Sequence, residues 1–148
     1  MPTTANDAPV PARFTFSPGQ KAFLDMPRKA IIATLRADGT AAQSVVYYAR
    51  ENNTLWISSN PTGSKANDLR ADPRVSILII ADERPAYLAI EGYAAVTEDV
   101  EDADRIRLMT RYLGEQGALD EVGRKPKSRP NARLRIYPVS AFSWNIAD

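Results

Sequence analysis

Trp-Ile-Ser-Ser-Asn-Pro-Thr-Gly-Ser-Lys-Ala-Asn-Asp-Leu-Arg-Ala-Asp-Pro-Arg-Val-Ser-Ile-Leu-Ile-Ile, residues 56–80, is the stretch that decides the fold. Paired serines end an apolar segment, a turn with proline and glycine follows, and Lys65 opens a short helix. That helix stops at Asp72-Pro73, because proline disfavours helical backbone in the residue before it. Residues 75–80 are apolar at every position except Ser76, which predicts a strand with both faces buried, as in a small barrel.

The turn in the middle of this stretch has the groups that an anion needs. Hydroxyls of Ser58 and Ser59, backbone N–H groups at a helix start and the ammonium of Lys65 converge there, which predicts a phosphate site. The alternative is a solvated turn followed by a surface lysine. However, a cation in the first turn of a helix is disfavoured by about 0.3–1 kcal/mol, so Lys65 is better explained beside an anion.

Composition restricts the classes of function. The chain has 148 residues, 44% of them hydrophobic and 25% charged, with a formal net charge of +1. This is typical of a globular domain and favours neither nucleic acid nor an anionic membrane as a partner. Cysteine and histidine are absent, which excludes disulfides, thiolate or imidazole catalysis, and metal or haem sites that need these ligands. No apolar run approaches the ~20 residues of a membrane span, so we expect a cytoplasmic protein without a metal.

The other segments predict a mainly β, α+β domain over residues 17–148, after a flexible arm at 1–16. Ser17 and Gln20 form a capping-box pattern that predicts a helix at 18–26. Six or seven strands with two or three short helices indicate a small β-barrel. The predicted elements are a three-stranded meander at 29–36, 41–49 and 54–59, a helix at 64–70, a strand at 86–96 with a bulge at Glu91-Gly92, and closing strands at 132–138 and 141–146.

Residues 99–113 have the one clear amphipathic pattern, which predicts a helix that ends at Gly114 and a loop at 114–130. The acids at 98–104 are explained by the helix dipole and not by catalysis. The basic segment at 124–129 is either a solvated face or an attractor for an anionic ligand tail. The predicted apolar face, at 3-3-3-4 spacing, consists of Val100, Ala103, Ile106, Met109 and Leu113.

Several segments together resemble the split β-barrel superfamily of pyridoxamine phosphate oxidase, which includes flavin and deazaflavin reductases that bind FMN or coenzyme F420. The resemblance covers residues 21–144 and implies a homodimer with two cofactor sites at the subunit interface. The segments are Lys-Ala-Ile-Ile-Ala-Thr-Leu-Arg-Ala-Asp-Gly-Thr at 29–40, Gln-Ser-Val-Val-Tyr-Tyr at 43–48, the serine-to-lysine turn at 58–65, Asn-Asp-Leu-Arg-Ala-Asp-Pro-Arg-Val-Ser-Ile at 67–77 and Ala-Tyr-Leu-Ala-Ile-Glu-Gly at 86–92.

The resemblance also implies roles for particular residues. Tyr87 of the other subunit would close the site, and Tyr48 and Tyr87 are candidate proton donors. By residue type alone these tyrosines are more often explained by packing, and the alternative for the polar residues of the strand at 43–46 is an exposed face. The implied phosphate ligands are Ser58, Ser59, Gly63, Ser64 and Lys65, and the residues implied along the tricyclic ring are Gln43, Ser44, Val45 and Val46.

Two departures from the resemblance bear on the cofactor. The oxidase branch carries an Arg-x-x-Leu-Leu-Lys pattern on a strand before its phosphate turn, and residues 56–59 contain no basic residue. Gly63 stands where related deazaflavin binders have arginine. Because no catalytic side-chain cluster stands out, a cofactor must carry the chemistry. We expect a reductase that passes a hydride from reduced F420 to a small organic substrate; the alternatives are an FMN-dependent oxidoreductase or flavin reductase, and a non-catalytic flavin or deazaflavin binder.

Overall fold

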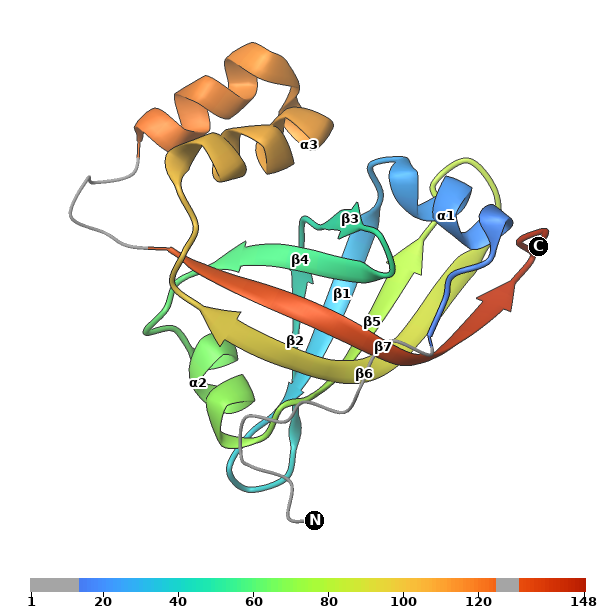
Figure 1. Ribbon diagram of the computed structural model, residues 1–148, viewed down its shortest axis with the longest axis horizontal. Helices are drawn as coiled ribbons and strands as arrows, with labels where there is room; N and C mark the ends of the chain where they lie inside the picture. The colour runs from blue at the N-terminus through green and yellow to red at the C-terminus, as the bar shows by residue number, and fades with distance from the viewer. Residues whose placement is uncertain (1–13, 125–130) are drawn as a thin grey trace.

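The computed structural model describes residues 14–124 and 131–148. Within these residues, seven strands form one antiparallel sheet and three helices lie around it (Figure 1). The predicted mainly β, α+β fold of the split-barrel kind is confirmed. In chain order the elements are α1 (Pro18–Asp25), β1 (Lys29–Leu35), β2 (Ala41–Val46), β3 (Ala49–Glu51), β4 (Thr54–Ser59), α2 (Ser64–Ala71), β5 (Arg74–Ile80), β6 (Tyr87–Thr97), α3 (Asp102–Gly123) and β7 (Ala132–Trp144).

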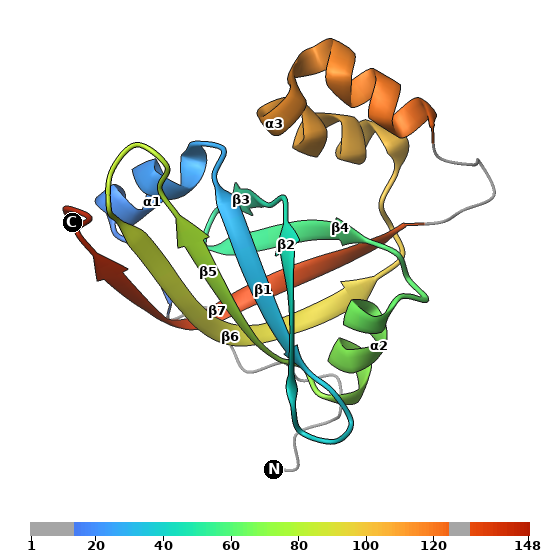
Figure 2. The ribbon, with the colours of Figure 1, turned by 180° about the vertical axis from the view of Figure 1, so that it is seen from behind.

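The sheet is strongly curved and encloses the core. Its strand order is β2-β1-β5-β6-β7-β4-β3, and Figure 2 shows β2, at one edge, crossing in front of β4 near the other. Ile32, Ile77 and Leu134, from three different strands, are fully buried inside the curve. Burying each such side chain contributes about 1.5–3 kcal/mol, so the curved sheet supplies most of the apolar core.

The predicted three-stranded meander is wrong at its second connection. β1 and β2 form a hairpin with Ala30 opposite Val46, but β4 pairs with β7 and not with β2. The chain leaves β2 after Val46 because Tyr48 turns into the core, where it is fully buried. The short strand β3 then pairs with β4. The ends of β2 and β4 therefore approach each other as two separate edges of the curved sheet.

Burial on β5 and the continuity of β7 also differ from the prediction. On β5, Ile77 and Ile79 are buried, whereas Leu78 and Ile80 are only half-buried because their face points outward. The two predicted closing strands are one strand, β7. The predicted bulge at Glu91-Gly92 is confirmed by a shift of register against β7. Gly92 is required there, since a Cβ atom would lie 2.1 Å from the carbonyl oxygen of Tyr137.

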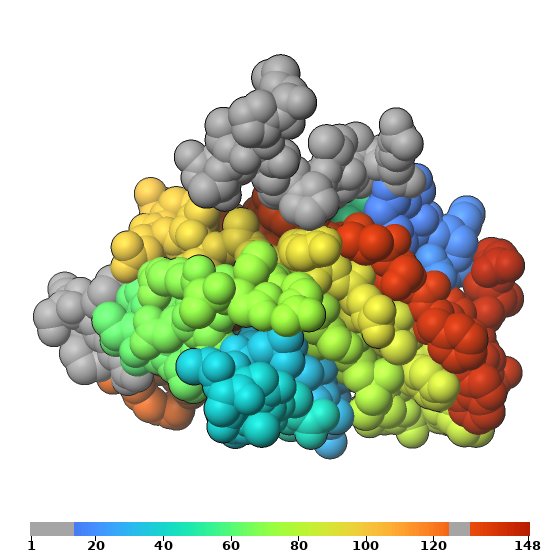
Figure 3. Space-filling model, turned by 90° about the horizontal axis from the view of Figure 1, so that it is seen from below, coloured from blue at the N-terminus to red at the C-terminus, as the bar shows by residue number. Residues whose placement is uncertain are grey.

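The two short helices form as the sequence predicts. Ser17 and Gln20 make the reciprocal capping-box hydrogen bonds at the start of α1. α2 buries Leu69 against the core, and the Thr34 hydroxyl on β1 donates to the Asp68 carboxylate at 3.0 Å. Figure 3 shows α2 (green) at the surface beside the hairpin turn of β1 and β2 (blue to cyan). The start of α2 is thus held in a fixed place relative to the sheet.

Helix α3 is longer than predicted and presents another face to the sheet. Gly114 has a φ of 75°, a backbone conformation that favours glycine, and it ends the first helical segment as predicted. The predicted loop after it is wrong, because a second helical segment continues to Gly123. Ala103 and Leu113 of the predicted apolar face are exposed, and Arg105 and Leu108 are buried instead. Lys125, Lys127 and Arg129 lie outside the described residues. None of the described helices is long and apolar enough to span a membrane.

Candidate functional site

A cavity of about 380 Å³ lies where the ends of β2 and β4 meet α2 and α3. It brings together most of the residues that the resemblance implies for the cofactor, from segments that are up to 64 positions apart. Tyr47, Asn60, Leu108 and Met109 join them. The lining residues are Val45, Val46, Tyr47, Ser58, Ser59, Asn60, Gly63, Ser64, Lys65, Leu108 and Met109.

The turn between β4 and α2 is braced by its own side chains. The Asn60 side-chain oxygen accepts hydrogen bonds from the backbone N–H and the hydroxyl of Thr62, at 3.1 and 3.0 Å. The N–H of Gly63 donates to the carbonyl of Asn60 at 3.1 Å, and Arg70 donates to the carbonyl of Pro61. The cavity wall at this turn is therefore preorganised before any ligand arrives.

The same turn leaves several donors without protein partners. Within the described residues, no side chain caps the N-terminus of α2 at Gly63, and no carboxylate forms an ion pair with Lys65. The half-buried hydroxyls of Ser58 and Ser59 line the cavity beside them. Two hydroxyls, free N–H groups at a helix start and one ammonium are what a phosphate group accepts from. The residues present fit the phosphate of a flavin-type cofactor.

The strand β2 gives the cavity an open side. Gln43 and Val45 lie on one face of β2 and are exposed, Val45 by 67%, while Ser44 and Val46 point the other way and are more buried. Gln43 and Ser44 do not line the cavity. Because side chains two apart share a strand face, Gln43 and Val45 extend a flat, accessible surface away from the cavity.

The opposite side is covered by α3 through an aromatic pair. Tyr47 lines the cavity and stacks on Tyr112 of α3, with ring centroids 4.1 Å apart and planes at 11°. The Tyr112 hydroxyl donates to the carbonyl of Arg28 at 2.9 Å, and burial raises its pKa. α3 therefore acts as a wall of the cavity. Sequence reasoning missed this, because Leu108 and Met109 are ordinary helix residues, and their position on the same cavity as Ser58 and Ser59 leaves no local signal.

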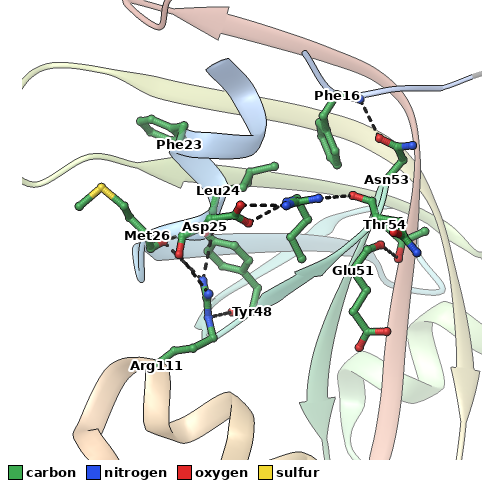
Figure 4. Close-up of polar contacts among 12 residues, drawn as sticks. Phe16, Phe23, Leu24, Asp25, Met26, Tyr48, Glu51, Asn53, Thr54 and Arg111 are labelled. Carbon is green, nitrogen blue, oxygen red and sulfur yellow. Dashed lines mark hydrogen bonds and ion pairs between the residues drawn. The ribbon is translucent and has the colours of Figure 1, made fainter. Parts of the chain in front are cut away.

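Tyr48 serves the docking of α1 and α3 and does not face the cavity. Its hydroxyl donates to the carbonyl of Leu24 at 3.0 Å, and burial raises its pKa further above the ordinary value. Arg111 donates to the carbonyls of Leu24, Asp25 and Met26 at the end of α1, at 3.2, 3.3 and 3.4 Å (Figure 4). The structure thus argues against Tyr48 as the proton donor, since its hydroxyl is held by backbone oxygens in the core.

Tyr87 lies at the far end of the sheet from the cavity. It is opposite Trp144 across β6 and β7 and stacks on it, with centroids 5.6 Å apart. Ser58 is opposite Arg133, which in turn is opposite Thr97 at the other end of β6. Tyr87 and Thr97 are ten positions apart on β6, which corresponds to about 33 Å of strand. Tyr87 can approach a cofactor site only in a second copy of the chain.

A second cavity, of about 430 Å³, lies near the bulge and contains none of the predicted site residues. Its lining includes Thr34, Arg74, Glu91 and Tyr93. Arg74 is already paired with Asp72 at 2.7 Å, which lowers the pKa of that carboxyl. This cavity is mostly apolar, its lining includes no lysine and its one arginine is already paired, so it is the weaker candidate for an anionic cofactor.

Comparison with known proteins gives the same fold. A conserved hypothetical protein from Mycobacterium tuberculosis, Rv2991, is 25% identical with a TM-score of 0.70, covering 90% of this chain and 87% of its own. An F420 reductase is 21% identical with a TM-score of 0.69, covering 86% and 98%. The heme storage protein HutZ from Vibrio cholerae is 20% identical with a TM-score of 0.62, covering 87% and 94%.

The sequence itself matches a family over nearly its whole length. The family model described as pyridoxamine 5'-phosphate oxidase aligns with residues 16–145. That range includes every element of the sheet and all three helices of the described chain. The predicted resemblance is confirmed at this level: the chain belongs to the pyridoxamine 5'-phosphate oxidase family.

Proposed function

We propose that this protein is an F420H2-dependent reductase that binds the cofactor phosphate in the cavity at the start of α2. The observation that carries the proposal is the set of free donors there: the Ser58 and Ser59 hydroxyls, the uncapped N-terminus of α2 and the unpaired Lys65. When bound, the reduced deazaflavin supplies the hydride to a small organic substrate.

The chain's own residues bind and orient the cofactor. The braced turn at 60–63 and Lys65 fix the phosphate, and this sets the depth of the tricyclic ring along the exposed face of β2. Val45 and Gln43 on that face would lie beside the ring, with Gln43 offering a hydrogen-bonding amide at its edge. Leu108 and Met109 exclude water from the phosphate end of the site.

The charge of the cavity favours F420 over FMN. Lys65 is the one charged residue that lines it, and neither β2 nor β4 contains a lysine or arginine. The phosphate of F420 is a diester with a single negative charge, whereas the terminal phosphate of FMN is a monoester with up to two. One lining cation is matched to the singly charged group. The F420 reductase among the similar structures shares this fold, which supports testing that cofactor first.

The alternatives are an FMN-dependent oxidoreductase or flavin reductase and a non-catalytic binder of either cofactor. Haem binding, suggested by the likeness to a heme storage protein, is less favoured, because this chain has no histidine or cysteine to ligate the iron. Consumption of F420H2 with an electron acceptor distinguishes an enzyme from a carrier.

A homodimer completes this proposal. Phe142 and Trp144 are 60% and 45% exposed on one face of β7, next to Tyr87 on β6. Large exposed aromatic side chains in a cluster are typical of an interface. Burying this cluster against a second copy would bring Tyr87 toward the partner's cofactor, where its hydroxyl or solvent supplies the proton. Sedimentation equilibrium of wild type and Phe142→Arg tests this: we expect a dimer and a weakened dimer, and a monomeric wild type would contradict it.

The function is tested by two titrations of the purified, cofactor-free protein, one with oxidised F420 and one with FMN, followed by ligand fluorescence. We expect F420 to bind at least about tenfold more tightly than FMN. Tighter binding of FMN would assign the protein to the FMN oxidoreductases. Binding of neither cofactor would reject both assignments.

A further inference from the structure

The second cavity, of about 430 Å³, is formed around the bulge between β6 and β7. Glu91 lies opposite Ser140 there. Gly92 lies opposite Pro138, so Val139 is an extra residue on β7 that has no partner on β6. The alternation of β7 is interrupted as a result, and the successive side chains of Val139 and Ser140 are both exposed and both line the cavity. Bulges that redirect side chains in this way are frequent beside ligand sites.

A row of directly opposite residues joins this cavity to β2. Residues opposite each other on antiparallel strands share a face of the sheet. All members of the row except Gln43 line the cavity. Because neighbouring strands are about 4.8 Å apart, the cavity begins one strand away from Gln43, beside the face of β2 on which the tricyclic ring is proposed to lie. Across β2, β1, β5, β6 and β7 the row consists of Gln43, Ala33, Ser76, Glu91 and Ser140.

The charge of the second cavity is opposite to that of the first. Glu91 is exposed and forms no ion pair among residues 14–124 and 131–148. Arg74, the one lysine or arginine among the described lining residues, is already paired with Asp72 at 2.7 Å. The hydroxyls of Ser76 and Ser140 flank Glu91 in the row, and the remaining lining is mostly apolar. This lining suits a ligand with an apolar body and one positive charge.

The size of the cavity sets the size of that ligand. Cavities that hold small organic molecules have volumes of about 300–1,000 Å³, and this one lies at the lower end of the range. Glu91 is two strands away from Ala33 in the row, which corresponds to about 10 Å. A molecule that reaches from the Glu91 carboxylate to the Ala33 end therefore needs an apolar body of that length.

We propose that the second cavity binds the organic substrate of the reductase, and that this substrate is an apolar amine whose ammonium group pairs with Glu91. This inference rests on the proposed function, since it names the substrate class of the same reaction. The reducible bond lies at the Ala33 end, next to Gln43. Reduction of a C=C or C=N bond there takes one hydride from the reduced cofactor and one proton from solvent, and leaves the cofactor oxidised. Glu91 holds the substrate and takes no part in the hydride transfer.

Three probes that share a phenylbutyl body test the charge preference: phenylbutylamine, phenylbutanol and phenylbutanoate. Isothermal titration calorimetry of the cofactor-free protein should show that the amine binds at least about tenfold more tightly than the alcohol, and that the carboxylate binds most weakly. In Glu91→Gln the amine should lose about tenfold and match the alcohol, whose affinity should not change. The melting temperature should also stay the same, because Glu91 has no ion-pair partner among the described residues.

Two further variants separate a specific site from a general effect of charge. Glu98→Gln, at an exposed position just after β6, removes the same charge away from the cavity and should leave all three affinities unchanged. Val139→Trp enlarges the 60% exposed side chain at the bulge, fills the cavity and should weaken the amine and the alcohol alike, by about fivefold or more. Equal binding of amine and alcohol to wild type, or an unchanged amine affinity in Glu91→Gln, would overturn the inference.

The failures of the inference and of the proposed function are distinguishable. F420 should bind to the protein saturated with phenylbutylamine within about twofold of its affinity for the free protein, because the two cavities are separate; mutual exclusion would overturn the substrate assignment. If F420 binds but none of the three probes does, the inference fails alone. If the probes bind as expected but neither F420 nor FMN does, the proposed function fails and the substrate role with it, and an amine site remains.

Discussion

The contact of α3 with α1, called here the α1 end, and the cavity at the start of α2, called the cavity end, differ in how well their polar groups are satisfied. At the α1 end, Arg111, Tyr112 and Tyr48 all donate hydrogen bonds to backbone carbonyls. At the cavity end, Lys65 of α2 has no ion-pair partner within the described residues, and no side chain among them caps the start of α2.

This difference separates structure from function between two neighbouring regions of the molecule. A cluster of polar groups that are all hydrogen-bonded stabilises the fold, because each buried donor has an acceptor. A cluster of unpaired donors costs stability in the free protein and gains it only when a ligand supplies the missing acceptors. Substitutions at the α1 end should therefore change the free energy of unfolding, and substitutions at the cavity end should change ligand affinity.

The largest effect is expected from Arg111→Met. It leaves carbonyls at the end of α1 without their donor and detaches α3 from α1, so the free energy of unfolding should fall by about 3 kcal/mol. Urea denaturation measures this change. The control is Arg124→Met: Arg124 is an exposed arginine just after α3 whose one ion pair among the described residues is with Glu121, and the variant should lose less than about 0.5 kcal/mol. Equal stability of the two variants would remove the distinction between the two ends.

Lys65→Ala should show the reverse pattern. Loss of a charge-assisted hydrogen bond should weaken F420 binding by about 1–3 kcal/mol. The urea midpoint should stay within error, because Lys65 has no ion-pair partner among residues 14–124 and 131–148. Fluorescence titration measures the affinity. Lys21→Ala on α1 removes the same charge away from the cavity and should leave the affinity unchanged. An unchanged dissociation constant for Lys65→Ala would remove the anchor assignment.

A smaller effect is expected from Tyr48→Phe, which deletes the hydroxyl and keeps the ring. The lost hydrogen bond to Leu24 should reduce the free energy of unfolding by about 1 kcal/mol. F420 affinity and the pH profile of F420H2 turnover should not change, because the hydroxyl does not face the cavity. If Tyr48→Phe bound F420 with unchanged affinity but lost turnover, Tyr48 would again be a candidate proton donor.

The smallest effect is a pH dependence at the α1 end. The Arg50 guanidinium, 2.7 Å from Asp25, lowers the pKa of that carboxyl. Because the pKa is lower in the folded state, this stabilisation is fully present above about pH 4, the ordinary value for aspartate, and is lost as the pH falls through the folded pKa. Unfolding of wild type and Asp25→Asn should therefore differ most at neutral pH and converge in strong acid. A constant difference between pH 7 and pH 2 would contradict this origin.

The local parts of the site were predictable from the sequence, and the long-range parts were not. The turn before α2 carries its own signals, since the serines, Pro61, Gly63 and Lys65 occur within eight residues. The separation of β2 from β4 has no local signal in the sequence, because contacts with residues far along the chain determine which strands pair. Tyr48 turns inward and contacts α1, and β4 pairs with β7.

Helix α3 shows why the spacing of apolar residues alone predicted the wrong buried face. The 3-3-3-4 pattern treats arginine as a solvent residue, but Arg105 is buried and Leu113 is exposed. The long apolar stem of an arginine can cover hydrophobic surface, and counting only apolar residues does not register this. Gly114 was correctly predicted to end a helical segment. However, a second helical segment follows it and ends at Gly123.

The most direct test is a map of backbone amide chemical shifts in the ¹⁵N-labelled protein as oxidised F420 is added. The account predicts that the largest changes occur at Val45 and Val46, from Ser58 to Lys65, and at Leu108 and Met109, with little change at Leu24, Tyr48 or Arg111. Changes confined to the α1 end, or to the residues around the second cavity at Arg74 and Tyr93, would contradict it.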